Sequence, residues 1–256
     1  PPPPRFFFPP QAGIRDSVAS RGLGDVYKRQ MKDSGVEWIG EIPSSWGMAP
    51  LGKLGELYGG LTGKNGNDFN SENNPMNKPF IPFTNIFNNT YISKDQFQNV
   101  VIENDEKQNK VRKHDLFFLM SSETHEDLGK SSILIEDVDE LYLNSFCKGF
   151  RITQTDVYPL FLNYQLTGDT HRQLISVEGN GFTRINLRQN KLNTTPIVLP
   201  PVEEQKLISR YLDKKTEQID QLVEKIQKKI DTLKDYRQSL ISSAVTGKFR
   251  VTEDMI

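Results

Sequence analysis

Residue types that could carry out catalysis are present in this chain of 256 residues, but their spacing completes no catalytic motif. The glycine-rich stretch ending in Gly63-Lys64 has the outline of a phosphate-binding loop. However, Tyr58 stands where the first glycine belongs, and Asn65 replaces the serine or threonine that would hold magnesium. A nuclease cluster could be imagined from four acidic residues, but acidic loop residues that bound a strand are far commoner: Asp115, Glu123, Glu126 and Asp127. We therefore expect no catalytic residue.

The possible metal ligands are equally scattered. His114, His125 and His171 lie far apart without ligand spacing, and Cys147 is the single cysteine, which excludes a cysteine-rich zinc site and an internal disulfide. We expect the chain itself to bind neither a metal nor a cofactor. No apolar run is long enough to span a bilayer, and the first residues lack a signal peptide's apolar core. A cytoplasmic location without a membrane partner is the expectation.

Side chains that could bind DNA gather at three places. Basic side chains neutralise phosphates, and Asn, Thr and Arg can read base edges. The candidates lie in the glycine-rich loop (Thr62, Lys64, Asn65), before an apolar run (Lys110, Arg112, Lys113) and around a second glycine-rich turn (Arg172, Thr183, Arg184, Asn186, Arg188). Residues 31–202 carry 16 Lys and Arg against 21 Asp and Glu, so a DNA surface must be local. Any one such cluster is more often an ordinary solvated face.

The elements that must position these side chains follow from the apolar pattern. Short apolar runs predict strands within 79–83, 100–102, 116–120, 132–135, 146–152 and 197–199, and residues 158–166 and 171–177 look helical. Asn-, Gly- and Ser-rich loops separate them. The mixture predicts an α+β domain over residues 31–199, with a curved mixed sheet and flanking helices.

Residues 200–247 predict a long helical arm. Pro200 and Pro201 suit a first turn, and Glu203 and Glu204 place negative charge at the positive end of the helix dipole. From Val202 onward the arm contains no proline, and its first glycine is Gly247, a suitable left-handed cap. A continuous arm would span roughly 60 Å at about 1.5 Å per residue. A lapse of apolar residues at 213–216 leaves open a short helix followed by a long one.

An apolar seam runs along this arm. Its members fall on alternating three- and four-residue steps, as in a coiled coil, with one polar position at Lys229: Ile219, Leu222, Ile226, Leu233, Tyr236 and Leu240. The seam could pack on the chain's own domain. However, a helix of this length reaches past a domain whose radius of gyration is on the order of 15 Å. We therefore predict that the seam pairs with a helix of a second copy or of a related repeat.

Three segments together resemble the specificity subunits of type I restriction–modification systems. Residues 31–46 resemble the opening of a target-recognition half, residues 199–205 resemble the junction from recognition domain to helix, and residues 237–248 resemble the end of the central helix. In that family, each of two recognition domains reads half of a split DNA site, and two antiparallel helices set the spacing. The resemblance implies partners: double-stranded DNA, methyltransferase subunits that use S-adenosylmethionine, and a motor–nuclease subunit that uses ATP and Mg.

The chain supplies only one such half, so it is either a natural half-subunit or a fragment of a longer reading frame. We expect a homodimer through the arm, or pairing with a second half, and a palindromic split target in the first case. The alternative from another class is a coiled-coil scaffolding protein that binds protein only. Residues 1–30 resemble translated adapter sequence and predict a non-native or disordered tail, with a proline-rich recognition tail as the alternative. Residues 248–256 form a second tail.

Overall fold

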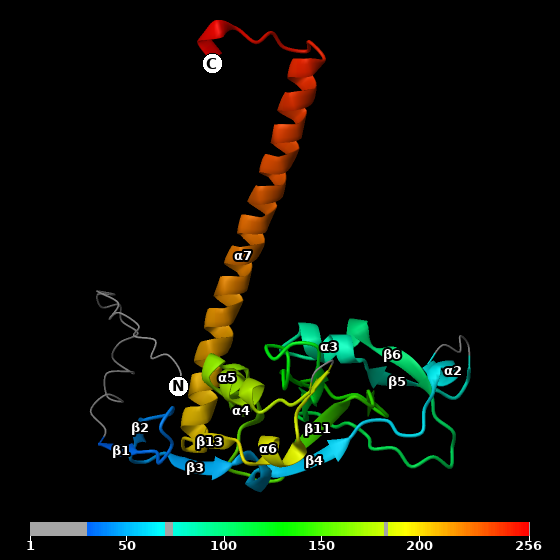
Figure 1. Ribbon diagram of the computed structural model, residues 1–256, viewed down its shortest axis with the longest axis vertical. Coiled ribbons are helices and arrows are strands. Elements are labelled where there is room, and N and C mark those ends of the chain that lie inside the picture. Colours follow the sequence, from blue (N-terminus) through cyan, green and yellow to red (C-terminus); the bar gives the residue numbers. More distant parts are fainter. Residues whose placement is uncertain (1–29, 70–73, 182–183, 256) are drawn as a thin grey trace.

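The computed structural model describes residues 30–69, 74–181 and 184–255. The predicted tail up to residue 29 and the candidate Thr183 lie outside the described residues. A mixed domain of strands and helices forms the base, and one long helix rises from it (Figure 1). The predicted α+β class with a long C-terminal helix is confirmed.

A four-stranded antiparallel sheet forms the centre of the domain. Its order is β4 (Gly55–Gly59), β11 (Cys147–Ile152), β7 (Leu116–Leu119) and β9 (Ser131–Ile133). All four residues of β7 are buried. Leu116 and Phe118 belong to one apolar cluster, whereas Phe117 and Leu119 belong to another. Since successive side chains of a strand point to opposite faces, β7 separates two cores, which explains its continuous apolar sequence.

A three-stranded mixed sheet lies beside the first. It has the order β10 (Tyr142–Leu143), β5 (Asn77–Ile81) and β6 (Gln98–Val101), with β10 parallel to β5 and β6 antiparallel to it. Phe80, Val100 and Tyr142 pack together in a third, smaller apolar cluster. Each predicted strand is thus present within one or two residues of its expected position, but the strands divide among three sheets, since β13 (Pro196–Leu199) pairs in a separate one.

Short pairs of strands and small helices complete the described part of the chain. The pairs are β1 (Met31–Asp33) with β2 (Glu41–Pro43), β3 (Gly47–Pro50) with β13 (Pro196–Leu199), and β8 (Ser121–Ser122) with β12 (Ile185–Asn186). The helices are η2 (Leu51–Lys53), α2 (Gly66–Phe69), α3 (Phe83–Asn88), η3 (Lys94–Gln96), α4 (Pro159–Thr167), α5 (Asp169–Val177), α6 (Gln189–Asn193) and η4 (Glu253–Met255). The two helical predictions correspond to α4 and α5.

The arm is one continuous helix, α7 (Val202–Val245), of 44 residues. The alternative with a break at 213–216 is wrong. The stretch contains neither glycine nor proline, and the Thr216 hydroxyl donates to the carbonyls of Leu212 and Asp213, so local polar groups bond within the helix. Gly247 ends the arm with φ of 71°, and the amide of Lys248 donates to the Ser243 carbonyl at 2.9 Å. Among the described residues, no helix has the apolar length required to cross a membrane.

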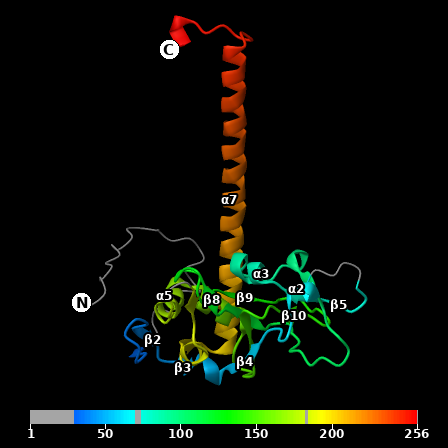
Figure 2. The ribbon, with the colours of Figure 1, turned by 45° about the vertical axis from the view of Figure 1, so that its right-hand side comes forward.

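The arm is exposed from residue 214 to residue 242, and both views show it standing clear of the base (Figures 1 and 2). The six seam residues are between 41% and 65% exposed. The alternative in which the seam packs on the chain's own domain is therefore wrong, because the domain covers none of the six side chains. The described chain leaves a long apolar stripe open to a partner.

Candidate nucleic-acid interface

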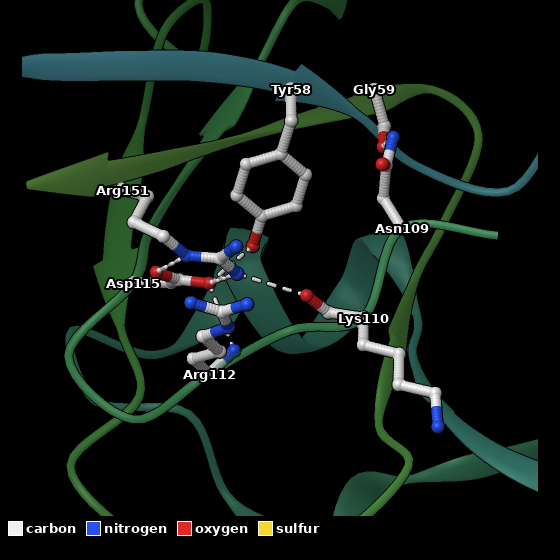
Figure 3. Close-up of polar contacts among 7 residues, drawn as sticks. All are labelled: Tyr58, Gly59, Asn109, Lys110, Arg112, Asp115 and Arg151. Carbon is white, nitrogen blue, oxygen red and sulfur yellow. Dashed lines mark hydrogen bonds and ion pairs between the residues drawn. The ribbon is translucent and has the colours of Figure 1, made fainter.

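A buried carboxylate organises one edge of the central sheet. Asp115 precedes β7 and is only 2% exposed. It accepts hydrogen bonds from Arg151 (Nε at 3.0 Å and Nη2 at 2.6 Å), from the Tyr58 hydroxyl at 2.7 Å and from the Arg112 amide at 2.8 Å (Figure 3). The bidentate contact fixes the plane of the Arg151 guanidinium. Arg151 also donates to the Lys110 carbonyl at 2.9 Å, so it connects β11 to the loop that carries Lys110, Arg112 and Lys113.

Neighbouring strands hold these side chains in place. Tyr58 on β4 lies opposite Gly149 on β11, and a Cβ at position 149 would collide with the tyrosine ring. The glycine therefore lets the ring lie flat across the strand, where it stacks 5.0 Å from the Arg151 guanidinium. Burial, with the Asp115 charge, raises the pKa of Tyr58, so its hydroxyl remains a donor. The hydrogen bond to Asp115 raises the pKa of Arg151.

This cluster borders an open groove of about 460 Å³. Lys110, Arg112 and Arg151 line it with the amides of Gln108 and Asn109. Lys110 is ion-paired with Glu140 at 2.9 Å and Arg151 with Asp115, so Arg112 adds the cation that has no ion pair with a described carboxylate. Its remaining lining residues are Glu56, Leu57 and Tyr58. Cations and amides at one groove match what phosphates and base edges require. The structure thus brings the predicted pair Lys110 and Arg112 to one surface, with exposed Lys113 on the same loop.

The first predicted loop adjoins this groove. Gln108 accepts from the Thr62 amide at 3.1 Å and donates to the Thr62 carbonyl at 2.9 Å, which ties the two loops together. Asn65 is exposed beside them. Lys64 does not fit the prediction: it forms an ion pair with Glu106 at 2.5 Å, and its side chain is 5% exposed. Its ammonium group points into the protein and is not presented to a phosphate.

A second candidate surface lies along β12 and the residues on either side of it. Arg184, Asn186 and Arg188 are exposed, whereas Ile185 and Leu187 between them are buried. This alternation places the three polar side chains on one face. The Arg184 guanidinium lies 6.0 Å from the ring of exposed Phe146, beside a pocket of about 390 Å³. The face combines two cations, an amide and an aromatic ring.

Arg172, predicted for this second surface, has a structural role instead. Its Nη2 donates to the Glu126 carbonyl at 2.6 Å. Burial lowers the pKa of its guanidinium. The side chain joins α5 to the loop after β8 and does not share the exposed face of Arg184.

The two surfaces lie at opposite ends of the central strands. Asp115 stands just before β7 and Ser121 follows its end, while Phe146 precedes β11 and Arg151 is the last residue but one of that strand. The length of a six-residue strand therefore separates the groove from the Arg184 surface. The same separation keeps Asp115 from Glu123 and Asp127, so the imagined nuclease cluster is not assembled. Asp115 is instead occupied by arginine, tyrosine and amide donors.

The sequence prediction missed Tyr58 and Arg151 as parts of an interface. A signal was present, because Arg151 interrupts an apolar run that was assigned to a strand. A cation within such a run requires a buried partner. Only the pairing of β11 with β7 identifies Asp115 as that partner.

Comparison with known proteins gives a consistent result. A family model described as the type I restriction modification DNA specificity domain matches residues 43–232. The EcoKI specificity subunit of Escherichia coli (strain K12), a type I restriction enzyme, is 26% identical over 212 residues, covering 82% of this chain and 44% of the relative. The StySPI specificity subunit of Salmonella potsdam is 26% identical over 211 residues, covering 81% and 44%. The chain thus spans less than half the length of these relatives.

Two solved structures share the fold. One comes from work on complex assembly and conformational transition of the type I R-M system, with a TM-score of 0.60, 18% identity, and coverage of 88% of this chain and 50% of that chain. The other is the HsdS subunit from Thermoanaerobacter tengcongensis, with a TM-score of 0.51, 17% identity, and coverage of 79% and 43%. Both likenesses extend the agreement from sequence to fold.

Proposed function

Because the chain belongs to the family of type I restriction modification DNA specificity domains, we propose that it recognises one half of a split double-stranded DNA target. It does so without catalysing a reaction. The methyltransferase subunits that dock on it use S-adenosylmethionine, and the motor–nuclease subunit uses ATP and Mg. The assembly acts in the cytoplasm. The observation that carries the proposal is the family match over both the domain and most of the arm.

DNA contact is proposed for the exposed cations and amides of the two surfaces. Arg184, Asn186 and Arg188 form one set, and the groove around Lys110 and Arg112 forms the other. Both sets lie in a domain with net negative charge, so the attraction for a polyanion must come from local clusters of cations such as these. Lys64 and Arg172, whose polar ends bond within the protein, are left out of the contact set.

Pairing through the arm would bring a second recognition domain into the assembly. We expect its exposed seam to pair with the arm of a second copy, giving a two-fold dimer. Residues 203–224 carry six acidic and four basic side chains, whereas residues 225–250 carry seven basic and two acidic. Antiparallel pairing sets the acidic root of one arm beside the basic end of the other, and parallel pairing sets like charges together. Charge therefore favours the antiparallel arrangement.

The test is methylome sequencing of a host that expresses this chain with the methyltransferase subunit of its own system. We expect methylated adenines at a split palindrome, because two identical halves read it. A solution mass of twice the chain at micromolar concentration is expected from light scattering. Unchanged methylation combined with a normal dimer would favour a scaffolding protein, and a monomer with non-palindromic methylation would show that another half completes the subunit.

A further inference from the structure

The face of α7 that meets the domain is polar at three regularly spaced positions. Gln205, Ser209 and Asp213 follow one another at four-residue intervals and so share one side of the helix. Gln205 and Ser209 are fully or almost fully buried. Residues 214–242 are exposed. Asp213 is therefore the last partly buried residue before this exposed stretch of the arm.

Gln205 provides the lower attachment. Its Oε1 accepts from the Tyr158 amide at 2.7 Å, and its Nε2 donates to the carbonyls of Asp156 and Pro200 at 2.8 and 2.7 Å. One side chain thus joins α7 to the segment that enters α4. Each of these bonds is directional, and their number fixes the position of the helix at this point.

Asp213 provides the upper attachment. Its Oδ1 lies 2.8 Å from the Tyr91 hydroxyl and 2.6 Å from the Tyr164 hydroxyl, and the two hydroxyls are 3.0 Å apart. Tyr164 belongs to α4, whereas Tyr91 follows α3 and bridges to Ile133 of β9. Burial, with the hydrogen bond to Asp213, raises the pKa of both tyrosines, so each hydroxyl keeps its proton. Three separate elements therefore meet at one carboxylate oxygen.

Two attachments on one face of α7 fix the direction in which the helix leaves the domain. Gln205 and Asp213 are eight residues apart, or about 12 Å, and Val245 lies about 60 Å from Gln205 at about 1.5 Å per residue. A displacement of about 1 Å at Asp213, with Gln205 as pivot, becomes about 5 Å at the far end. Successive base pairs are about 3.4 Å apart. A freedom of about 1 Å at Asp213 therefore displaces the far end of the arm by more than the rise of one base pair.

We propose that the cluster of Tyr91, Tyr164 and Asp213, here called the root anchor, determines how strictly the paired chains select the spacing between their half-sites. The inference rests on the proposed function. Apolar packing between α4 and α7 has no strong direction, whereas the root anchor holds the arm at one angle. These three residues position the arm and touch no base.

The first test measures the arm angle without DNA. Spin labels at K53C and Q238C, both at exposed positions, report the distance from domain to arm by double electron–electron resonance, with excess unlabelled chain suppressing signals between copies. Native Cys147 is buried. We expect a narrow distance distribution for the parent chain and one at least twice as broad for Asp213→Ala. Alanine favours the helix more than aspartate does, so the arm itself stays helical.

Matched variants distinguish the loss of the anchor contacts from the mere loss of a negative charge. Asp220→Ala removes the same charge from an exposed position that lines the groove beside Tyr91, and it should leave the distribution unchanged. Asp213→Asn keeps an acceptor oxygen and should restore most of the narrow distribution. The Tyr91→Phe/Tyr164→Phe double variant should match Asp213→Ala. A narrow distribution with an unchanged mean in both disruptive variants would overturn the proposal.

The second test measures spacing. Duplexes bound by the chain with its methyltransferase subunit are selected from a random-sequence library, and the base pairs between the two enriched half-sites are counted. The parent chain should enrich one spacing, and Asp213→Ala should add spacings at least one base pair longer or shorter with the same half-site sequences. Retention of a single spacing by Asp213→Ala would refute the inference. If the parent chain enriches no split site, the proposed function fails, and the resonance measurement still judges the anchor.

Discussion

Replacement of Asp115 with asparagine keeps the volume of the side chain but removes the charge that Arg151 faces. Asp115 accepts from two nitrogens of Arg151, from Tyr58 and from the Arg112 amide. Asparagine can turn only one oxygen toward these donors, and its amide group meets a donor on the other side. The guanidinium is left without its counter-charge beside a tyrosine ring.

The magnitude follows from burial. Breaking a fully buried ion pair by removing one partner costs about 3–5 kcal/mol. Asp115 is 2% exposed but the Arg151 side chain is 30% exposed, so water compensates part of the loss. We expect a loss of about 3 kcal/mol in the free energy of unfolding, toward the lower end of that range. For a domain of this size, that corresponds to a fall in Tm of about 6–12 °C.

The assay is thermal unfolding followed by circular dichroism, with urea unfolding as a second measurement. Glu136→Gln is the control, because its ion pair with Lys94 is exposed and such pairs contribute about 1 kcal/mol at most. Asp115→Asn/Arg151→Met should be more stable than Asp115→Asn alone, since no unpaired cation remains. If Asp115→Asn unfolds within about 1 kcal/mol of the parent chain, the Asp115 contacts do not organise this edge of the sheet.

Three further predictions concern other parts of the chain. Arg184→Ala and Arg188→Ala should each weaken DNA binding about tenfold or more in a filter-binding assay, while the free energy of unfolding stays within about 1 kcal/mol; normal binding by both would move the interface to the groove. Burial lowers the pKa of His171 below its ordinary value of 6.5, so the unfolded state takes up the proton first. Stability should therefore be complete above about pH 6.5 and fall below it, and His171→Gln should flatten this slope in thermal unfolding. Ile226→Lys should convert the dimer to monomer by light scattering because it places a charge in the seam, whereas Gln238→Lys adds the same charge outside the seam and should leave the mass unchanged; a dimeric Ile226→Lys would exclude the seam as the interface.

The local pattern of apolar residues was sufficient to predict the helices and strands. The run Leu116–Leu119 is apolar on both faces, and the structure buries both faces between two cores. The arm was predictable in length and in its end at Gly247, because helix signals act within a few residues. Continuity through 213–216 was not predictable, since the apolar lapse there is explained by polar contacts to distant residues such as Tyr91.

The candidate sites depended on contacts between residues that are far apart in the sequence. Sequence alone grouped Lys64 and Arg172 with surface cations, but Glu106 and the Glu126 carbonyl draw both side chains inward. Conversely, Arg184, Asn186 and Arg188 share a face because β12 pairs with β8. By itself, the sequence determined the α+β class, the strand positions and the exposed seam, since apolar periodicity records which side of each element avoids water. Only the tertiary structure decided which charged groups are paired and in which direction the arm leaves the domain, because an ion pair or an anchor requires partners that the fold brings together from distant positions.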